Sequence, residues 1–422
     1  MSRFKSKVEN PNTKHKGCIV RLYPTEEQAT MIKKTIGSAR KIYNLLLSDA
    51  KEQYEKDKTF LLLHRSYTYY KNPDNWKAGE DYSYLSEVDS HALNQAQLNL
   101  FQAYQNFFAK RAGFPTFKRK AAPKQSYTTA YSNKNIRIEF KINENGKKTY
   151  YLRLPKIGFV KIKMSREIPE SYKIKSVTVT KTSTNKYYAS LMLEYEDKQQ
   201  KAELDPNNSI GLDMDMKNLF TDDQGNRATY PKFYRLTQEK LARKQRQLSK
   251  MQKGSKNRQK QRIKVAKIHE KITNQRKDFL HKLSKDIADT YDIVVIEDLN
   301  MQELSQSLNL GKSVYDIGWG MFTEFLKYKL EDRGKKLIKI DRWFPSSKTC
   351  NVCGYKYDNL ALADRSWECP QCHTIHDRDV NAAINIRNEG LRIYFESMNR
   401  RADGVSSLIL AGTNTALSEK PS

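Results

Sequence analysis

Four cysteines in two closely spaced pairs constrain the fold of this chain more than any other feature. Cys350 and Cys353 form one CxxC pair, and after fifteen further residues Cys369 and Cys372 form a second. Each pair lets two thiolates converge on one tetrahedral ion, and Gly354 follows the first pair where a tight turn is needed. The spacing therefore predicts a zinc ribbon in which Zn²⁺ has a structural role.

Two alternatives to this ligand set need to be weighed. The stretch CPQCH (369–373) also matches the C-x-x-C-H signature of c-type haem attachment. That interpretation leaves the first cysteine pair without a role and requires export, for which the sequence shows no leader. His373 could replace one cysteine as a ligand, but four thiolates already suffice. Cys18 stands alone on a predicted strand and is expected to be a small buried hydrophobic residue.

The charge of the chain points to a polyanionic partner. Across 422 residues there are 76 Lys and Arg against 48 Asp and Glu, a formal net charge of +28. Such an excess is typical of proteins that bind nucleic acid. A membrane is a weaker candidate because no apolar run approaches the roughly 20 residues that span a bilayer. We therefore expect a cytoplasmic nucleic-acid-binding protein of two or three domains.

The first half of the chain predicts helices set beside a β domain. A short strand at 16–23 precedes a helix that starts near Pro24 and carries an apolar stripe, and a second helix follows at 90–111. From about residue 116 the sequence alternates in short runs separated by turn residues. These runs predict a small antiparallel β domain of about five strands, with many lysines on its outward positions.

From about residue 205 the pattern becomes α/β. It predicts strands around 210–216, 291–299 and 337–343, a hairpin-like return turned at 222–226, and a helix ended by Gly334. A last helix begins at the sequence DVNAAINIRNEG and is expected to end at Gly390. The remaining 30 or so residues are polar and predict a loose tail.

A basic helical hairpin is expected within this half. Residues 232–285 contain nineteen Lys and Arg and three Asp and Glu, a net charge of +16. Apolar stripes on both sides of Gly254 and Ser255 predict two antiparallel helices. A charge run is often only a solvated face, but the near absence of acids removes the usual i,i+4 pairing. A surface that follows phosphates is therefore favoured.

Three acids stand where a nuclease needs them. Asp213 and Glu297 lie within or at the end of otherwise apolar strands, and Asp379 opens the last helix. Carboxylates in such positions are costly unless a metal or partner offsets them. If they converge, they form a site for Mg²⁺, and two such ions would support phosphodiester hydrolysis. Each acid also has a simpler reading: Glu297 could merely end a strand, and Asp377 or Asp379 could be an N-cap.

Several stretches together resemble the TnpB family, the RNA-guided nucleases of insertion sequences related to compact type V CRISPR effectors. They are GLDMDMKNLF (211–220), SKNRQKQRIKVAKIHEKITNQRKDFLHKLS (255–284), IVVIEDLNM (293–301), CNVCG (350–354) and WECPQCHTIHDRDVNAAINI (367–386). The resemblance covers residues 16–395. It implies a multidomain α+β fold: an RNase H-like RuvC α/β domain with an inserted zinc ribbon and a basic helical hairpin, plus a β-barrel-like wedge domain with a helical recognition insert.

The resemblance also suggests domain boundaries. They are 1–23 and 116–204 for the wedge domain, 24–115 for the recognition helices, 205–343 and 376–395 for RuvC with its hairpin at 232–288, 344–375 for the ribbon, and 396–422 for a flexible tail. By motif match, Asp213, Glu297 and Asp379 take the catalytic, magnesium-binding positions. One departure is Asp215, which stands where the family usually has a small residue. It could be an extra ligand or a spare surface acid, and we favour the latter.

The implied partners are a guide RNA and double-stranded target DNA, with a separate transposase encoded nearby as a further candidate and a monomer as the favoured oligomeric state. Side chains expected to contact nucleic acid are Asn94, Gln95, Gln97, Lys118, Arg119, Thr128, Thr129, Lys256, Arg258 and Arg262. For the helix at 90–111, a solvated polar face explains the same residues equally well.

Three rival functions stay open at this point. A compact type V CRISPR effector would share every catalytic residue, and only its genomic neighbours would distinguish it. A non-cleaving RNA-guided repressor should have lost at least one of the three acids, which this chain retains. A transposase proper is disfavoured because no paired His-Tyr nucleophile motif is evident.

Overall fold

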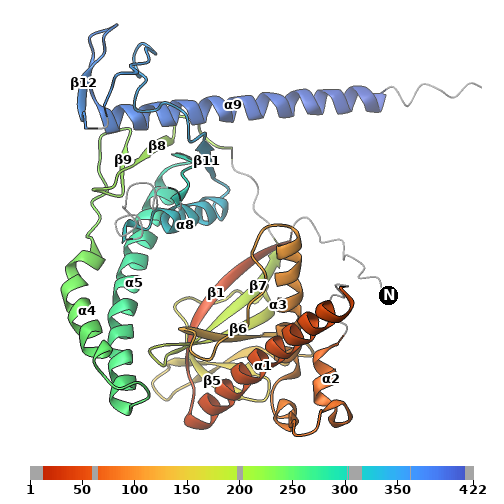
Figure 1. Cartoon of the computed structure of the whole chain (residues 1–422). Helices are drawn as coiled ribbons and strands as arrows, with labels where there is room; N and C mark the ends of the chain where they lie inside the picture. Colours follow the sequence, from red (N-terminus) through yellow and green to blue (C-terminus); the bar gives the residue numbers. More distant parts are fainter. Residues whose placement is uncertain are drawn as a thin grey trace, which may run out of the picture. The chain divides into compact units, whose positions relative to one another are not determined.

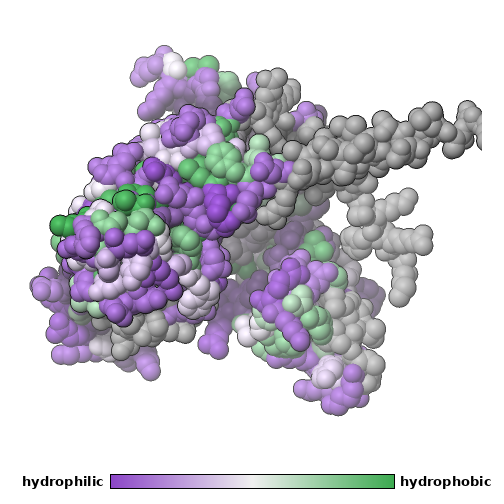
Figure 2. Space-filling view, turned by 90° about the horizontal axis from the view of Figure 1, so that it is seen from above, coloured by the Kyte–Doolittle hydropathy of each residue, from purple (hydrophilic) through white to green (hydrophobic). Residues whose placement is uncertain are grey.

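The computed structural model describes residues 13–58, 65–196, 203–301, 303, 316–361 and 363–413, with side chains in the last helix described through Asn399. They belong to two compact units, Met1–Lys198 and Gln199–Ser422 (Figure 1). Hydrophilic side chains predominate on the face shown in Figure 2, with smaller apolar patches between them. Among the described helices, none is both long and apolar enough to cross a membrane.

The first unit is built on one antiparallel sheet. Its strands run in the order β2-β6-β7-β1-β5-β4-β3. Their bounds are β1 Thr13–Tyr23, β2 Lys124–Ala130, β3 Arg137–Ile142, β4 Lys148–Leu154, β5 Gly158–Lys163, β6 Lys173–Thr182 and β7 Tyr187–Glu196. Six strands follow residue 116 where about five were predicted. The first strand lies between β7 and β5, so it joins the sheet of the later strands.

Helices pack against this sheet and share its core. Helix α1 (Glu26–Asp57) starts at a capping box formed by Thr25 and Gln28. The predicted stripe is confirmed, because its four members are at most 3% exposed: Ile32, Ile36, Ile42 and Leu46. Helix α3 (Ser90–Phe108) packs on α1 and β2. The shorter helices between them are α2 (Tyr67–Lys71), η1 (Pro73–Asn75) and η2 (Ser83–Ser86).

The second unit contains a four-stranded sheet covered on both faces. Strands β8 (Ser209–Met214), β10 (Ile293–Glu297) and β11 (Lys336–Ile340) are parallel, and β9 (Phe220–Asp222) pairs antiparallel with β8. Helices α5 (Lys256–Thr290) and α8 (Trp319–Glu331) pack with Val294 and Ile296 on one face. Helix α9 (Arg378–Thr413) packs with Ile293 and Val295 on the other. Burial on both faces explains the continuous apolar runs in these strands.

The predicted helical hairpin is confirmed. Helix α4 (Phe233–Ser249) packs along α5, with the connection at residues 250–255 (Figure 1). Ser255 caps α5 by accepting a hydrogen bond from the backbone N–H of Arg258. On the inner side of α5, Gln261 is buried and donates to the carbonyl of Lys244, so a polar bond joins the two helices.

The last helix differs from the prediction. It was expected to end at Gly390 and give way to a loose tail from residue 396, but α9 continues to Thr413. Gly390 does not have a positive φ, and it serves instead as a point of close contact with Val295. The sequence pattern of a C-terminal glycine was therefore misread. Residues 414–422 of the predicted tail lie outside the described residues.

Candidate metal and nucleic-acid sites

Two glycines bring helix α9 into direct contact with the sheet. A Cβ at Gly211 on β8 would lie 2.1 Å from the carbonyl oxygen of Ala383 and 2.8 Å from the backbone nitrogen of Arg387. A Cβ at Gly390 on α9 would lie 2.3 Å from a methyl of Val295 on β10. At Gly211 the backbones of helix and strand meet directly, whereas at Gly390 the backbone of α9 rests on the side chain of Val295.

This contact brings the three candidate acids to one edge of the sheet. Asp213 lies two residues beyond Gly211 and Glu297 two beyond Val295, so both project from the face that α9 covers. The parallel register of β8 and β10 pairs Leu212 with Ile296, the residues immediately before these two acids. Asp379 lies one helical turn before the part of α9 that meets β8. The three acids therefore lie where the parallel strands end, near enough for Glu297 and Asp379 to act electrostatically on Asp213. We call Asp213, Glu297 and Asp379 together the acid edge.

The electrostatics of this edge favour a bound cation. Burial, followed by the negative charges of Glu297, Asp379 and Asp215, raises the pKa of Asp213 well above its usual range. Burial also raises the pKa of Glu297, although the hydroxyl of Ser346 donates to its Oε1 at 2.8 Å and opposes that rise. Crowded carboxylates of this kind repel one another unless a metal or a proton offsets their charge.

Neighbouring charges separate the roles of the two aspartates at the start of α9. Asp377 accepts hydrogen bonds from the backbone N–H groups of Asp379 and Val380, so it is the helix cap. Asp377 also pairs with Arg227 at 2.8 Å. Asp379 instead receives a hydrogen bond of 3.2 Å from the guanidinium of Arg365 in the cysteine module. The second oxygen of Asp379 lies 3.5 Å from the same guanidinium, so Asp379 is paired with Arg365 rather than used as the helix cap.

Asp215 has a structural task of its own. Its carboxylate accepts hydrogen bonds from the backbone N–H of Lys217 at 2.8 Å and the side-chain amide of Asn218 at 2.7 Å. Burial acts to raise its pKa, but these bonds outweigh it and the pKa lies below its usual value. Asp215 therefore stabilises the turn between β8 and β9.

The four cysteines gather as the spacing predicted. Their sulfur atoms all lie within 4.8 Å of one another, and the Cys350–Cys372 and Cys353–Cys369 sulfur separations are both 3.6 Å. A tetrahedron with Zn–S bonds of about 2.3 Å has edges of about 3.8 Å, so the cluster fits Zn²⁺. Because Cys350 and Cys353 share one site with Cys369 and Cys372, the first cysteine pair also belongs to the metal site. This excludes haem attachment at the second pair.

Two histidines beside the cluster do not add ligands. His373, in the left-handed conformation with φ 56°, directs its ring to Glu368 and is exposed. His376 is buried, packs on Trp367 and places its Nε2 3.1 Å from the sulfur of Cys350. A hydrogen bond from an imidazole N–H to a thiolate is the kind of support that structural zinc sites have around their ligands.

Two buried asparagines, not anticipated from the sequence, connect the cysteine module to the acid edge. Asn381 and Asn385 on α9 each donate to the carbonyl oxygens of Ser346 and Thr349. Ser346 in turn donates to Glu297, and Thr349 immediately precedes the first ligand cysteine. The signal that could have revealed them is a polar pair at i,i+4 on an otherwise apolar helix face.

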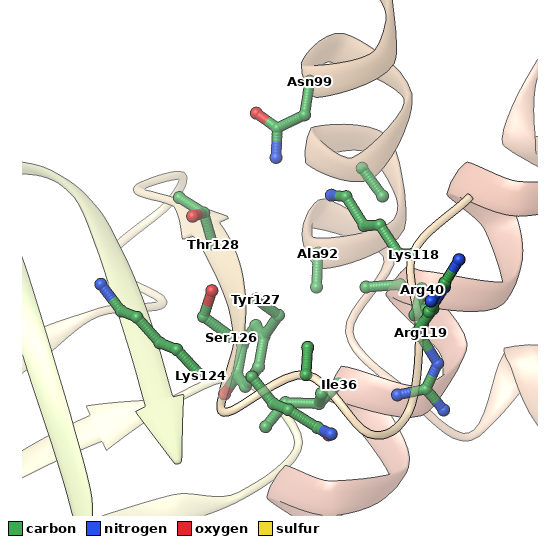
Figure 3. Close-up of a pocket in the computed structure, with 14 residues that line it drawn as sticks. Ile36, Arg40, Ala92, Asn99, Lys118, Arg119, Lys124, Ser126, Tyr127 and Thr128 are labelled. Atoms are coloured by element: carbon green, nitrogen blue, oxygen red, sulfur yellow. The ribbon is translucent and has the colours of Figure 1, made fainter. Parts of the chain in front are cut away.

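In the first unit, several predicted contacts surround a pocket of about 300 Å³ between α1, α3 and β2 (Figure 3). Lys118, Arg119 and Thr128 line it, as predicted residues of nucleic-acid contact. Arg40 from α1 and Asn99 from α3 also line it, and neither was predicted. The pocket therefore combines cationic and amide side chains with the apolar walls of two helices.

Thr129 corrects the prediction for this strand. Alternation along β2 turns Thr129 to the core side with Tyr127, where it is fully buried. Thr128 lies on the opposite face and shares a hydrogen bond of 2.8 Å with Thr178. Adjacent strand residues cannot both read a ligand on one face, so of the two only Thr128 is placed for a contact.

On α3 the three predicted amides differ in availability. Gln97 accepts a hydrogen bond of 2.9 Å from the backbone N–H of Tyr67, which ties it to the α2 region. Gln95 donates along its own helix at 3.2 Å, and Asn94 is exposed. The structure thus gives Gln97 a supporting role in the fold.

On the helical hairpin, Lys256 and Arg262 are exposed, but Arg258 is not free. Its guanidinium donates to the carbonyls of Leu248 and Met251 at 2.7 and 2.8 Å. Leu248 lies in the last turn of α4 and Met251 in the connection that follows it. Arg258 therefore closes the hairpin through one guanidinium nitrogen, and its contact with phosphate stays a prediction.

Comparison with protein families gives three matches along the chain. Residues 190–308 match a family described as "Probable transposase", the IS605-type OrfB family. Residues 319–386 match "Cas12f1-like, TNB domain", and residues 14–59 match a "Helix-turn-helix domain" of OrfB proteins. In the described part of that last range, the structure has strand β1 followed by one long helix, α1.

Individual relatives cover nearly the whole chain. A Streptomyces pristinaespiralis protein named "Putative RNA-guided DNA endonuclease" is 36% identical over 374 residues, 88% of each chain. The Escherichia coli K12 protein InsQ, named in the same terms, is 29% identical over 385 residues, 87% of this chain and 90% of its own. Among solved structures, the mini-RNA-guided endonuclease Cas_phi3 matches with a TM-score of 0.50 and 8% identity, covering 89% of this chain and 92% of its own. That last likeness concerns the fold alone.

Proposed function

Because this chain belongs to the TnpB (IS605-type OrfB) family, we propose that it is an RNA-guided DNA endonuclease whose hydrolytic site is the edge formed by Asp213, Glu297 and Asp379. The observation that carries this proposal is the gathering of three acids at one strand edge, where burial and the charges of Glu297 and Asp379 raise the pKa of Asp213. The chain has a net charge of +28, so a cluster of acids is an exception on its surface. Such a cluster would repel a nucleic acid by itself and is suited to binding a metal cation.

The donor set suits magnesium. Asp213, Glu297 and Asp379 offer only carboxylate oxygens, the ligands that Mg²⁺ prefers. When bound, two such ions would supply the charge that stabilises the attacking and leaving oxygens of a phosphodiester. Ser346 holds Glu297 through one oxygen, which leaves the other free for a metal.

Two arginines provide contacts for the DNA strand. Arg365 keeps more than half of its side chain exposed while it pairs with Asp379, and Arg227 pairs with the capping Asp377 and is similarly exposed. A guanidinium offers five donors, so each retains hydrogen-bonding capacity for a phosphate oxygen. In this proposal they hold the backbone of the strand on both sides of the scissile phosphate.

The guide RNA would bind through phosphate contacts. The helical hairpin at 232–285 carries a net charge of +16, and its exposed members include Lys256 and Arg262. Contacts of this kind recognise the A-form shape of an RNA rather than its sequence. Sequence specificity then comes from pairing between guide and target strand.

The pocket in Figure 3 is our candidate for reading a short motif beside the target. Thr128 and Asn99 can hydrogen-bond base edges, while Lys118, Arg119 and Arg40 can hold the flanking phosphates. In this assignment the amide and hydroxyl groups determine which DNA sequence is preferred, and the cationic side chains contribute to the affinity for DNA.

The zinc ribbon has a supporting role in this scheme. The cysteine cluster ends the loop that Asn381 and Asn385 hold against α9, and that loop also carries Ser346. The ribbon therefore fixes the chain between Glu297 and Asp379. Zinc is structural here and magnesium catalytic.

A compact type V CRISPR effector is the main alternative. It would use the same three acids with a guide from a repeat array. The match to the Cas12f1-like TNB domain at 319–386 is the observation that keeps this alternative open. A non-cleaving repressor is less well supported, because Asp213, Glu297 and Asp379 are all present. For a transposase proper, the family description at 190–308 is the only support, and the sequence carries no paired His-Tyr nucleophile motif.

The test is to express the chain with its native flanking DNA, sequence the RNA that co-purifies, and assay that ribonucleoprotein on a matching DNA with Mg²⁺. A discrete RNA extending from a transposon end, with cleavage dependent on its sequence, would support the proposal. An RNA with a repeated scaffold and varied spacers would move the protein to the CRISPR alternative. Heterogeneous cellular RNA without guided cleavage would refute RNA guidance.

A further inference from the structure

Trp343 is exposed to an unusual degree for its type. Its side chain is 84% exposed, whereas Trp319 and Trp367 in the same unit are 2% and 6% exposed. A tryptophan stabilises a folded protein mainly when its side chain is buried, so the exposed Trp343 adds little to stability. Such a side chain calls for an explanation outside the core.

The loop that carries Trp343 is attached to Glu297 at both ends. Ile340, the last residue of β11, is the register partner of Glu297 on β10. Ser346 returns to the same residue and donates to its carboxylate at 2.8 Å. Trp343 stands midway, three residues from each attachment, and at 3.8 Å per residue its backbone lies within about 11 Å of both. The indole is therefore at the rim of the acid edge.

Hydrogen bonds hold this loop in one conformation. The carboxylate of Asp341 accepts from the backbone N–H of Trp343 at 2.7 Å, and its carbonyl accepts from Phe344 at 3.2 Å. Phe344 packs inward against the core beneath α9, and its carbonyl accepts from the N–H of Ser346 at 2.8 Å. With Phe344 directed inward, the turn presents Trp343 outward.

We propose that Trp343 is a stacking platform for one base of the single-stranded DNA that enters the acid edge. The inference rests on the proposed function, since it assigns the position of that same substrate. Stacking on an aromatic ring is tolerant of sequence because every base has a π face. A platform at this rim would orient the strand so that the next phosphate reaches the carboxylates.

The surroundings favour a nucleobase over an apolar protein partner. The two residues before Trp343 are the exposed, charged Asp341 and Arg342. A protein interface would need a contiguous apolar patch, and a single indole among charges does not provide one. An isolated aromatic ring among charged groups on a basic chain is the arrangement found where proteins hold single strands.

The experiment compares Trp343→Ala with Trp343→Phe, which keeps an aromatic ring. Leu236→Ala is the matched control, because Leu236 is 77% exposed on α4 of the same unit. Each ribonucleoprotein is titrated, with Ca²⁺ replacing Mg²⁺, with a single-stranded DNA of about 12 nucleotides carrying the fluorescent base 2-aminopurine at successive positions. Guided cleavage of a matching duplex is measured in parallel with Mg²⁺.

We expect Trp343→Ala to weaken DNA binding or slow cleavage by roughly 5- to 150-fold, the range for loss of one stacked base. The 2-aminopurine response should be confined to one or two adjacent positions, vanish in Trp343→Ala, and persist in Trp343→Phe and Leu236→Ala. Melting of all variants should be unchanged, since Trp343 contributes little buried area.

The outcomes separate the two proposals. Normal cleavage and binding by Trp343→Ala would overturn the stacking platform while the proposed function stands. A Trp343-dependent DNA signal in a wild-type protein that never cleaves would support the platform and overturn the proposed function. A stronger Trp343-dependent response to a single-stranded RNA of the same sequence would refute the assignment of DNA as the ligand.

Discussion

Replacing Gly211 by alanine tests the contact that brings the acids together. The added Cβ would lie 2.1 Å from the carbonyl oxygen of Ala383 on α9, and real Cβ atoms essentially never approach closer than 3.0 Å. The neighbouring atom belongs to the backbone, so no side-chain rotation relieves the clash. Helix and strand must therefore separate by about 0.9 Å at this point.

That displacement has two measurable consequences. Overpacking of a tight core contact costs about 1–3 kcal/mol, occasionally more, so the melting temperature of the second unit should fall by several degrees. Asp379 sits one turn along α9 from the clash, and a misplacement of about 1 Å at a catalytic group commonly costs about 100-fold in rate. We expect cleavage to fall by about two orders of magnitude, while guide RNA still co-purifies.

The assay is single-turnover cleavage of a matching duplex by the ribonucleoprotein, with thermal melting followed in parallel. Gly17→Ala is the control, because it is also a strand glycine and a Cβ there would meet nothing within 4 Å. The control should cleave at the wild-type rate. If Gly211→Ala also melted and cleaved like wild type, the close contact of α9 with β8 would be refuted, and with it our account of how the acids converge.

Three further predictions concern the metals and the charges. Asp379→Ala or Glu297→Ala should slow cleavage by roughly 1,000-fold or more, because a bound metal stabilises the transition state by several kcal/mol. Guided DNA binding, measured by mobility shift, should persist; loss of binding as well would mean that the acids are structural. Cys369→Ser should release zinc, measured by elemental analysis, and lower the melting temperature by several degrees, because metal binding is coupled to folding. The control Cys18→Ser should retain zinc. An unchanged melting curve for Cys369→Ser would show that the zinc ribbon does not stabilise the fold. Because the folded protein raises the pKa of Asp213, this group contributes stability only at low pH and loses it as pH rises through the native pKa. In buffer without Mg²⁺, Asp213→Asn should therefore melt a few degrees higher than wild type at neutral pH and lose that advantage below about pH 4. Equal melting at both pH values would show that burial and the neighbouring acids do not raise the pKa of Asp213.

Features set by neighbouring residues were predictable from the sequence. The capping box before α1 and its apolar stripe depend on residues three or four apart, and both are present. The same holds for the cysteine pairs, whose short spacing alone obliges two sulfurs to lie together. The net charge of the helical hairpin follows from its composition alone. Each of these patterns is local, so chain connectivity decides it.

Features set by distant partners were missed or misread. Gly390 looked like a helix end because its sequence context does not reveal that Val295 lies against it. The sequence did not reveal that Arg258 donates to the carbonyl of Leu248 in the preceding helix. Thr129 looked available until the packing of β2 placed it in the core. In each case a partner brought close only by folding determines what the side chain does.

The acid edge shows most clearly which features the sequence determines and which depend on folding. The sequence alone determined that apolar strands end in carboxylates and that a cysteine module precedes the last helix. It could not decide which of several neighbouring acids share a site, because that depends on partners far away in the chain. Only the folded structure assigns Asp377 to the helix cap and Asp215 to a turn, and brings Asp379 near enough to Asp213 for its charge to raise the pKa of Asp213. The physical reason is the contact at Gly211, where the absence of one methyl group lets a helix and a strand meet backbone to backbone.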